Sequence, residues 1–346
     1  MMVRIARSAA FALALLASLT PALAETCLRG VNLAGAEFGS LPGKRDTDYT
    51  YPNAATIQYF ASLGASAIRL PFRWERLQPV LGEPLADDEL AALDAVVGMA
   101  TAAGLTVILD PHNYAYYNEQ PIGSDAVPTS AFALFWARLA AHYAGQPQVV
   151  FSLMNEPYDV KASDWLGMAN AAIAAIREVG APNLILVPGT AYTGAHSWTK
   201  DLPVGNNSKV MGGVVDPLGR YAYDVHQYLD ADFSGRNAEC SGADAALAGI
   251  ASVTEWLKAN GKRGFLGEFA ASDDPACLAA MTRIVATVNA AKSEWIGWTY
   301  WAGGPWWPDD YPFTIQPTDA GDRPQAVTLK PLMATGDAPC GEAAKP

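Results

Sequence analysis

Eight apolar, strand-like segments recur at nearly even intervals along this chain, and helix-like segments separate most of them. The residues that mark the ends of these segments lie 31 to 43 residues apart: Asn32, Arg69, His112, Asn155, Leu186, His226, Gly267 and Thr299. Strands that alternate with helices form parallel βα units, because two neighbouring parallel strands need a long crossover connection. Eight such units predict an α/β fold, a closed (β/α)8 TIM barrel.

Helices are expected between these segments, at residues 54–63, 88–103, 130–143, 163–179, 243–260 and 275–291. Several of them end directly before a glycine, the usual helix stop. Only the segment after Leu186 lacks a clear long helix. The alternative fold is a doubly wound open sheet, but such a sheet usually has fewer strands and a glycine-rich phosphate turn, which this chain lacks. No low-complexity linker divides the chain, so residues 25–346 are expected to form one catalytic domain.

Residues 1–24 have the features of a secretory signal peptide. Arg4 and Arg7 supply the positive charge, residues 8–19 form an uncharged apolar region, and the Ala-Leu-Ala at 22–24 matches a cleavage site. We expect cleavage between Ala24 and Glu25, secretion to the extracellular or periplasmic space, and no membrane attachment afterwards. A membrane anchor is the weaker interpretation, because the apolar run is shorter than the ~20 residues of a spanning helix.

Four cysteines follow the expected cleavage site: Cys27, Cys240, Cys277 and Cys340. In an oxidising compartment they should form two disulfides, for which three connectivities are possible. We predict Cys240–Cys277, because both residues lie in segments that flank the strand ending near Gly267, and Cys27–Cys340 then follows by exclusion. The chain has no Cys-x-x-Cys spacing, so a zinc or redox site is not expected.

The charge and the aromatic content limit the classes of partner. The formal net charge is −12 and no cluster of Lys or Arg offsets it, which disfavours nucleic acid and other polyanions. A neutral substrate fits better. The chain has 10 Trp and 14 Tyr, whose rings can stack on the apolar faces of sugars, although core packing must account for most of them. We expect a monomer without a cofactor.

Two glutamates stand at the ends of buried strand-like segments. Glu156, in Asn155-Glu156-Pro157, follows the apolar run 149–154, and Glu268 follows 112 residues later, after another apolar segment. A carboxylate at the end of a buried strand is costly unless it has a function. A single such glutamate could equally be a solvated strand end, but two of them suggest acid/base chemistry on a glycosidic bond.

Further polar and aromatic residues occupy the same kind of position. The carboxyl ends of barrel strands meet around one site, so these side chains are expected to converge. They are Arg69, His112, Asn155, His226, Tyr228 and Trp301. His226 and Tyr228 are two residues apart, so on extended backbone they project to the same side. A lone histidine at a strand end is more often structural, but the convergence with two glutamates and an arginine favours a functional role.

With these residues in this order, the chain resembles glycoside hydrolase family 5, and in particular its endo-β-1,4-glucanases. The resemblance runs from about residue 29 to residue 307, nearly the whole mature chain. The Asn-Glu-Pro and Gly-Glu-Phe motifs are short, but they occur in the family's order together with Arg69, Asp-Pro-His-Asn-Tyr at 110–114 and Asp-Val-His-Gln-Tyr at 224–228.

The resemblance implies that Glu156 is the acid/base and Glu268 the nucleophile of a retaining mechanism. Arg69 and Tyr228 would donate hydrogen bonds to the nucleophile and keep it ionised. Asn155 would donate to the sugar 2-OH, an interaction that strengthens in the transition state.

The remaining substrate-binding candidates are histidines, an asparagine and tryptophans. His112 and His226 would bind hydroxyls or orient the carboxylates, and Trp301 would form the floor of the subsite at the cleavage point. Asn113, beside His112, joins the substrate-binding set. Three further stacking candidates could equally be ordinary loop packing. They are Trp198, Trp306 and Trp307.

The expected function is therefore a secreted, retaining endo-β-1,4-glucanase that acts on cellulose or a related β-glucan. A β-mannanase or xyloglucanase is the alternative, because the catalytic residues do not name the sugar. A carbohydrate-binding barrel without catalysis is disfavoured by the presence of both glutamates, although a fold alone never proves a function. A metal-dependent hydrolase is disfavoured because no plausible His/Asp ligand cluster is evident.

Overall fold

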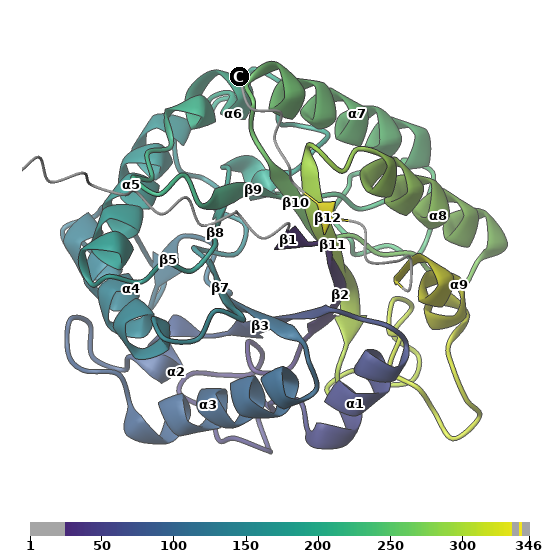
Figure 1. The fold of residues 1–346 in the computed structure, drawn as a ribbon, viewed down its shortest axis with the longest axis horizontal. Coiled ribbons are helices and arrows are strands. Elements are labelled where there is room, and N and C mark those ends of the chain that lie inside the picture. Colours follow the sequence, from purple (N-terminus) through teal and green to yellow (C-terminus); the bar gives the residue numbers. More distant parts are fainter. Residues whose placement is uncertain (1–24, 334–338, 341–346) are drawn as a thin grey trace, which may run out of the picture.

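The computed structural model describes residues 25–333 and 339–340. Within this part of the chain, eight parallel strands close into one barrel, around which they follow one another in chain order (Figure 1). The barrel strands are β2 (Leu28–Leu33), β3 (Ala67–Phe72), β4 (Thr106–Pro111), β7 (Val149–Ser152), β8 (Ile185–Pro188), β9 (Tyr221–His226), β10 (Gly264–Glu268) and β11 (Trp295–Gly303). The predicted (β/α)8 barrel is confirmed.

Long helices surround the barrel (Figure 1). They are α1 (Ala54–Ser62), α3 (Asp87–Ala102), α4 (Thr129–Tyr143), α5 (Ala162–Glu178), α7 (Ala243–Ala259), α8 (Pro275–Ala290) and α9 (Pro324–Met333). Each of the six helices expected from the sequence begins and ends within one residue of its predicted bounds. Gly64, Gly104, Gly180 and Gly261 follow four of these helices with positive φ angles, which glycine adopts without steric cost.

The connection after β8 is irregular, as expected. It contains the short α6 (Asn207–Val210) and two 3-10 turns, at 191–193 and 211–213. The remaining short elements are α2 (Trp74–Leu77), the hairpin of β5 (Tyr116–Tyr117) with β6 (Gln120–Pro121), and the pairing of β1 (Glu25–Thr26) with β12 (Pro339–Cys340).

An apolar cluster from six barrel strands, distinct from the main core, includes Ile108, Val150, Leu186, Ala222, Phe265 and Ile296. Successive residues of a strand point to opposite faces, so residues two apart share a face. Asp110 therefore shares the face of Ile108, and Asp224 shares that of Ala222, one step closer to the carboxyl end of each strand. Both carboxylates are fully buried. Charged groups thus follow the apolar cluster at the end of the barrel where such folds carry their active sites.

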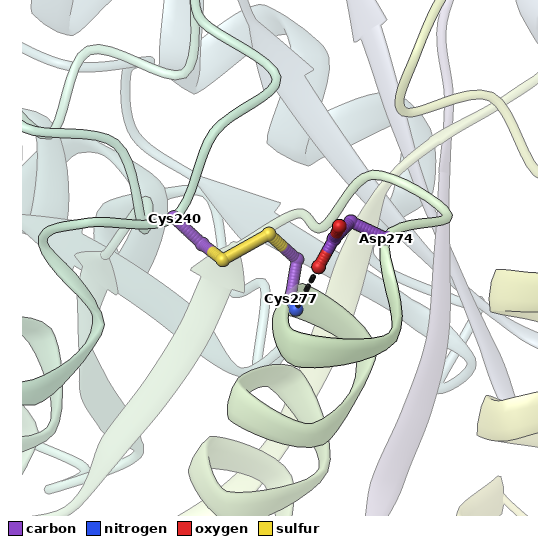
Figure 2. Close-up of side chains that lie close together, drawn as sticks. All are labelled: Cys240, Asp274 and Cys277. Carbon is purple, nitrogen blue, oxygen red and sulfur yellow. Dashed lines mark hydrogen bonds between the residues drawn. A yellow bond between two sulfur atoms is a disulfide. The ribbon is translucent and has the colours of Figure 1, made fainter.

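Two disulfides have the predicted connectivity. Cys27–Cys340 joins positions 313 residues apart, next to the β1–β12 pair. Cys240–Cys277 joins the loop after β9 to the first turn of α8, where the Asp274 carboxylate accepts hydrogen bonds from backbone N–H groups, including that of Cys277 (Figure 2).

The export prediction concerns residues 1–24, and the prediction of no membrane attachment concerns the rest of the chain. None of the helices in the described part is both long and apolar enough to span a lipid bilayer. The predicted signal peptide at 1–24 lies outside the described residues, and so do residues 334–338 and 341–346 of the predicted domain.

Candidate active site

A cavity of about 470 Å3 opens beside the carboxyl ends of the barrel strands. Its lining includes Glu156, His226 and Tyr228, which the sequence had singled out, and also Tyr114 and Tyr192. Because these residues come from the loops after four different strands and from the end of β9 itself, closure of the barrel is what brings them together.

Glu268 ends strand β10 with its carboxylate almost fully buried. The carboxylate accepts a hydrogen bond of 2.7 Å from Arg69 Nη1 and one of 2.6 Å from the Tyr228 hydroxyl. Burial by itself raises the pKa of Glu268, but the charges of His226 and Arg69 act in the opposite direction and outweigh it, so that the net shift of the pKa is downward. The two donors expected from the sequence are present, and the carboxylate is held in its ionised form.

Glu156 lies four residues beyond β7, in a backbone conformation with φ of +40°. Such left-handed values are unusual for a side chain of this size and occur preferentially at functional sites. A hydrogen bond of 2.7 Å joins Glu156 Oε1 to His226 Nδ1. One oxygen each of Glu156 and Glu268 and one nitrogen of His226 all lie within 4.8 Å of one another. An oxygen–oxygen distance of this size fits the ~5–5.5 Å spacing of retaining carboxyl pairs better than the ~6.5–9.5 Å spacing of inverting ones.

The Arg69 guanidinium connects the nucleophile candidate with the neighbouring strands. It is fully buried, donates 2.8 Å to Asn155 Oδ1 and 2.9 Å to Asn32 Oδ1, and lies 3.1 Å from Asp110. With Asp110 and Glu268 both in contact, its charge is paired within the site. Because Arg69 holds the amide oxygen of Asn155, the amide N–H groups point away from it and are free to act as donors.

One of those donors is used by His112. Asn155 Nδ2 lies 3.1 Å from His112 Nε2, and His112 Nδ1 lies 2.7 Å from Asp110 Oδ2. The contact with the carboxylate favours a proton on Nδ1, which leaves Nε2 as the acceptor for the amide. The His112 ring also stacks on Trp301, with ring centroids 5.6 Å apart. His112 thus orients both Asn155 and the indole.

This arrangement can be compared with known proteins. The sequence model of the cellulase family, glycosyl hydrolase family 5, matches residues 29–304. The chain belongs to this family.

Proteins named as endo-β-1,4-glucanases are similar to this family 5 hydrolase. It is 38% identical to endo-beta-1,4-glucanase B of Emericella nidulans, over 84% of this chain and 86% of that one. The endo-beta-1,4-glucanase Xac0029 of Xanthomonas axonopodis pv. citri has 44% identity and a TM-score of 0.87, covering 89% of this chain and 98% of that chain. XacCel5A in complex with cellopentaose matches equally well, with 44% identity, a TM-score of 0.87, and 89% and 99% coverage.

Three of the four tryptophans predicted to bind substrate in this family 5 chain lie in β11 or in the loop after it. Trp301, in β11, lies beside His112 and donates 3.1 Å from Nε1 to the Tyr311 hydroxyl. Trp307 is half-buried and stacks on Tyr311 with a centroid distance of 3.9 Å, and Trp306 stacks on Phe38 at 5.3 Å.

Trp198 and Asn113 correct the sequence-based prediction. Trp198 is fully buried, packed edge-on against Tyr223 and Trp256, so it has no face to offer a sugar. Asn113 is buried too, and both ends of its amide are used within the protein: Nδ2 donates 2.6 Å to Glu75, and Oδ1 accepts 2.9 Å from the Trp74 backbone. Both residues serve the fold of the loops, and their assignment to substrate binding is wrong.

Sequence analysis missed several residues around the cavity. Tyr192, His196 and Phe233 line it, and the His196 and Phe233 rings stack with centroids 4.3 Å apart. They lie in irregular loops, which carry no periodic signal. Asp110 and Asp224, by contrast, could have been found, because each stands two residues before a histidine on the same face of its strand.

Two groups of ligand-type side chains occur among the described residues. In the first, Cys240 and Cys277 are joined to each other and Asp274 caps α8, so the sulfurs are not available as thiolates (Figure 2). The second is the set of Glu156, His226 and Glu268. The carboxylates of this set already accept hydrogen bonds or share them with the imidazole, and the sequence singled out both glutamates as candidates for acid/base chemistry.

Proposed function

We propose that this family 5 hydrolase is a secreted endo-β-1,4-glucanase that cleaves internal bonds of cellulose or a related β-glucan with retention of configuration. The observation that carries the proposal is the close approach of the Glu156 and Glu268 carboxylates, within 4.8 Å, beside Arg69 and Tyr228. The names of its relatives, which include endo-β-1,4-glucanases of fungi and bacteria, support the substrate class. A bound cellopentaose in XacCel5A supports it further.

In the first chemical step, a Glu268 oxygen attacks the anomeric carbon and forms a glycosyl ester. Glu156 gives its proton to the glycosidic oxygen, the bond from that oxygen to the anomeric carbon breaks, and the leaving chain departs with a new hydroxyl. Arg69 and Tyr228 keep Glu268 ionised until it attacks. The second donor position on the Asn155 amide is suited to the 2-OH of the same sugar.

In the second step, Glu156 acts as the base. It removes a proton from a water molecule, the water oxygen attacks the anomeric carbon, and Glu268 leaves as a carboxylate. Two displacements at one carbon restore the β-configuration, and each glutamate returns to its starting protonation state.

The test is a comparison of polysaccharides. Viscosity and reducing ends are followed side by side on carboxymethylcellulose, β-glucan, mannan and xyloglucan, with the Glu268→Gln variant as the inactive control. We expect a rapid fall in viscosity of the β-1,4-glucans while few reducing ends appear, because internal cuts shorten chains most. Faster cleavage of mannan or xyloglucan than of any linear glucan would replace the substrate assignment with the mannanase or xyloglucanase alternative.

The stereochemistry has its own readout. NMR on the earliest products of a short cello-oligosaccharide should show the β-anomer first. An α-anomer appearing first would contradict the retaining assignment, because a single displacement by water inverts the configuration.

A further inference from the structure

Two buried polar atoms near the acid/base candidate face each other without a hydrogen-bond partner in the described part of the chain. They are Asp224 Oδ1 and His226 Nε2, 3.8 Å apart. Both residues belong to β9, and because they are two apart they lie on the same face of the strand. Both side chains are at most 2% exposed, so water does not readily replace the missing partners. Orphaned buried atoms of opposite character at this distance call for a functional explanation.

The groups around Asp224 Oδ1 and His226 Nε2 offer these two atoms few hydrogen-bond partners other than each other. The other Asp224 oxygen accepts 3.1 Å from the Ser152 hydroxyl. A Cβ on Gly267 would lie 2.2 Å from Asp224 Oδ1 and 2.9 Å from His226 Nε2, so the β10 backbone closes over the gap and only glycine fits there.

Four charged residues from other strands and loops act on Asp224 and His226. Arg69 from β3 and Asp110 from β4 act on Asp224, and Glu156 and Glu268 act on His226. His226 Nδ1 is already engaged by Glu156 at 2.7 Å and lies 3.6 Å from Glu268. The only ring atom of His226 left for Asp224 is therefore Nε2.

We propose that Asp224 is a positioning residue that keeps a proton on Nε2 of His226, and thereby makes Nδ1 the nitrogen that shares a proton with Glu156. The proposal rests on the proposed role of Glu156 as acid/base. A neutral imidazole carries one proton, and the partner of one nitrogen decides which nitrogen holds it. A gap of 3.8 Å is longer than a hydrogen bond, but side-chain rotations that bring the two atoms about 1 Å closer would form one.

The electrostatic consequence has a definite sign. Burial lowers the pKa of His226, while Glu268, Glu156 and Asp224 raise it, and the net shift is upward. Removing the Asp224 charge takes away one of the groups that hold protons in the Glu156–His226 pair. Without the Asp224 charge, the deprotonated form of the pair is less strongly repelled, so the pair loses its proton at lower pH and its pKa falls. The alkaline limb of the kcat/KM profile reports loss of the essential acid from the free enzyme, and this limb should move to lower pH.

The experiment compares Asp224→Asn with Ser152→Ala. Asparagine keeps the shape of Asp224 and removes its charge, whereas Ser152→Ala removes a hydrogen bond to Asp224 and leaves the charge in place. On cellohexaose we expect the alkaline limb of Asp224→Asn to move down by about one pH unit, which is roughly a tenfold loss of kcat/KM at pH values on that limb. Ser152→Ala should keep the limb in place. On a dinitrophenyl cellobioside, whose leaving group needs little protonation, the loss should be much smaller.

A second readout does not depend on activity. In protein labelled with 15N-histidine, the imidazole shifts of His226 should show a proton on Nε2, and this signature should weaken in Asp224→Asn. If the variant keeps both the wild-type alkaline limb and the His226 shifts while its melting temperature falls, Asp224 is merely structural and the proposal is wrong. A failure of the acid/base assignment looks different: Glu156→Ala would retain full activity on cellohexaose while the 15N signature persisted.

Discussion

At the Glu268 carboxylate, burial and charge act in opposite directions. Removal from water favours the protonated acid, but two directed donors and nearby cationic groups favour the carboxylate, and they outweigh burial. Glu156 is more exposed, at 16% of its side-chain surface, and its direct hydrogen bond is to His226 instead of Arg69. Two glutamates within 4.8 Å thus have different environments, which is how one site can supply a nucleophile and an acid.

Replacing Glu268, the proposed nucleophile, tests the assignment of roles. Glu268→Gln keeps the size of the side chain but removes the attacking oxygen anion, so we expect kcat on β-glucan to fall by at least about 10³-fold. The circular dichroism spectrum and the binding of cellopentaose, measured by calorimetry, should persist. Substantial residual turnover by well-folded protein would mean that another group is the nucleophile.

The Tyr228 hydroxyl tests the electrostatics of the same carboxylate. It donates 2.6 Å to Glu268, and a hydrogen bond to the charged form lowers the pKa. Tyr228→Phe removes this bond, so the pKa of Glu268 should rise, and the acidic limb of kcat/KM should move to higher pH. A hydrogen bond to a charged group contributes about 1.5–3 kcal/mol, which corresponds to roughly one to two pH units.

Tyr117→Phe is the matched control for that experiment. Tyr117 is also buried, but its hydroxyl donates to the Gln78 backbone carbonyl, away from both glutamates. This variant should lose some stability without a shift of the acidic limb. Equal shifts in both variants would point to a general effect of lost hydroxyl groups.

At the scale of elements, the loop between β9 and α7 is held by internal hydrogen bonds. Buried Asp230 accepts from the Ser234 hydroxyl at 3.0 Å and from the Gly235 and Asn237 backbone N–H groups at 3.0 and 3.3 Å. The Cys240–Cys277 disulfide then ties the end of this loop to α8. Phe233, which lines the cavity, lies within this cross-linked loop.

Removing this disulfide should weaken both stability and substrate binding. Cys240 and Cys277 are 37 residues apart, and closing a loop of this length stabilises a protein by about 3–4 kcal/mol in the chain-entropy description. For the double variant Cys240→Ser, Cys277→Ser we expect a loss of this order in urea unfolding and a higher KM on cello-oligosaccharides. A variant as stable as the wild type would show that the Asp230 hydrogen bonds suffice to hold the loop.

At the scale of the molecule, the barrel and the Cys27–Cys340 disulfide connect the two ends of the described chain. The β1–β12 pair and this disulfide join residues 25–27 to residues 339–340, so the segment that precedes the first barrel strand is held to the segment that follows α9. Both disulfides fit an oxidising compartment.

Export is testable by the mature N-terminus. Because residues 22–24 match a cleavage site after an apolar run, secreted protein should begin at Glu25. N-terminal sequencing or intact-mass measurement of the secreted enzyme gives the answer. A chain that begins well upstream of Glu25, or that stays with the membrane fraction, contradicts the prediction.

Local patterns in the sequence were enough to predict the barrel strands and six of the long helices, but not α9 or the short elements. Hydrophobic periodicity and helix-stopping glycines report on neighbours within a few residues, so the bounds of these six helices were predicted to within one residue and the eight strands in their order. Glu156 and Glu268 were found for the same reason, because each ends a run of apolar residues.

Only the tertiary structure decided which side chains meet. Trp198 and Trp301 are indistinguishable by residue type, yet one is packed between Tyr223 and Trp256 while the other lies against His112. The gap between Asp224 and His226 likewise depends on the backbone of β10 closing over it. The physical reason is that a contact depends on distances between segments up to hundreds of residues apart, which closure of the barrel sets and no local pattern encodes.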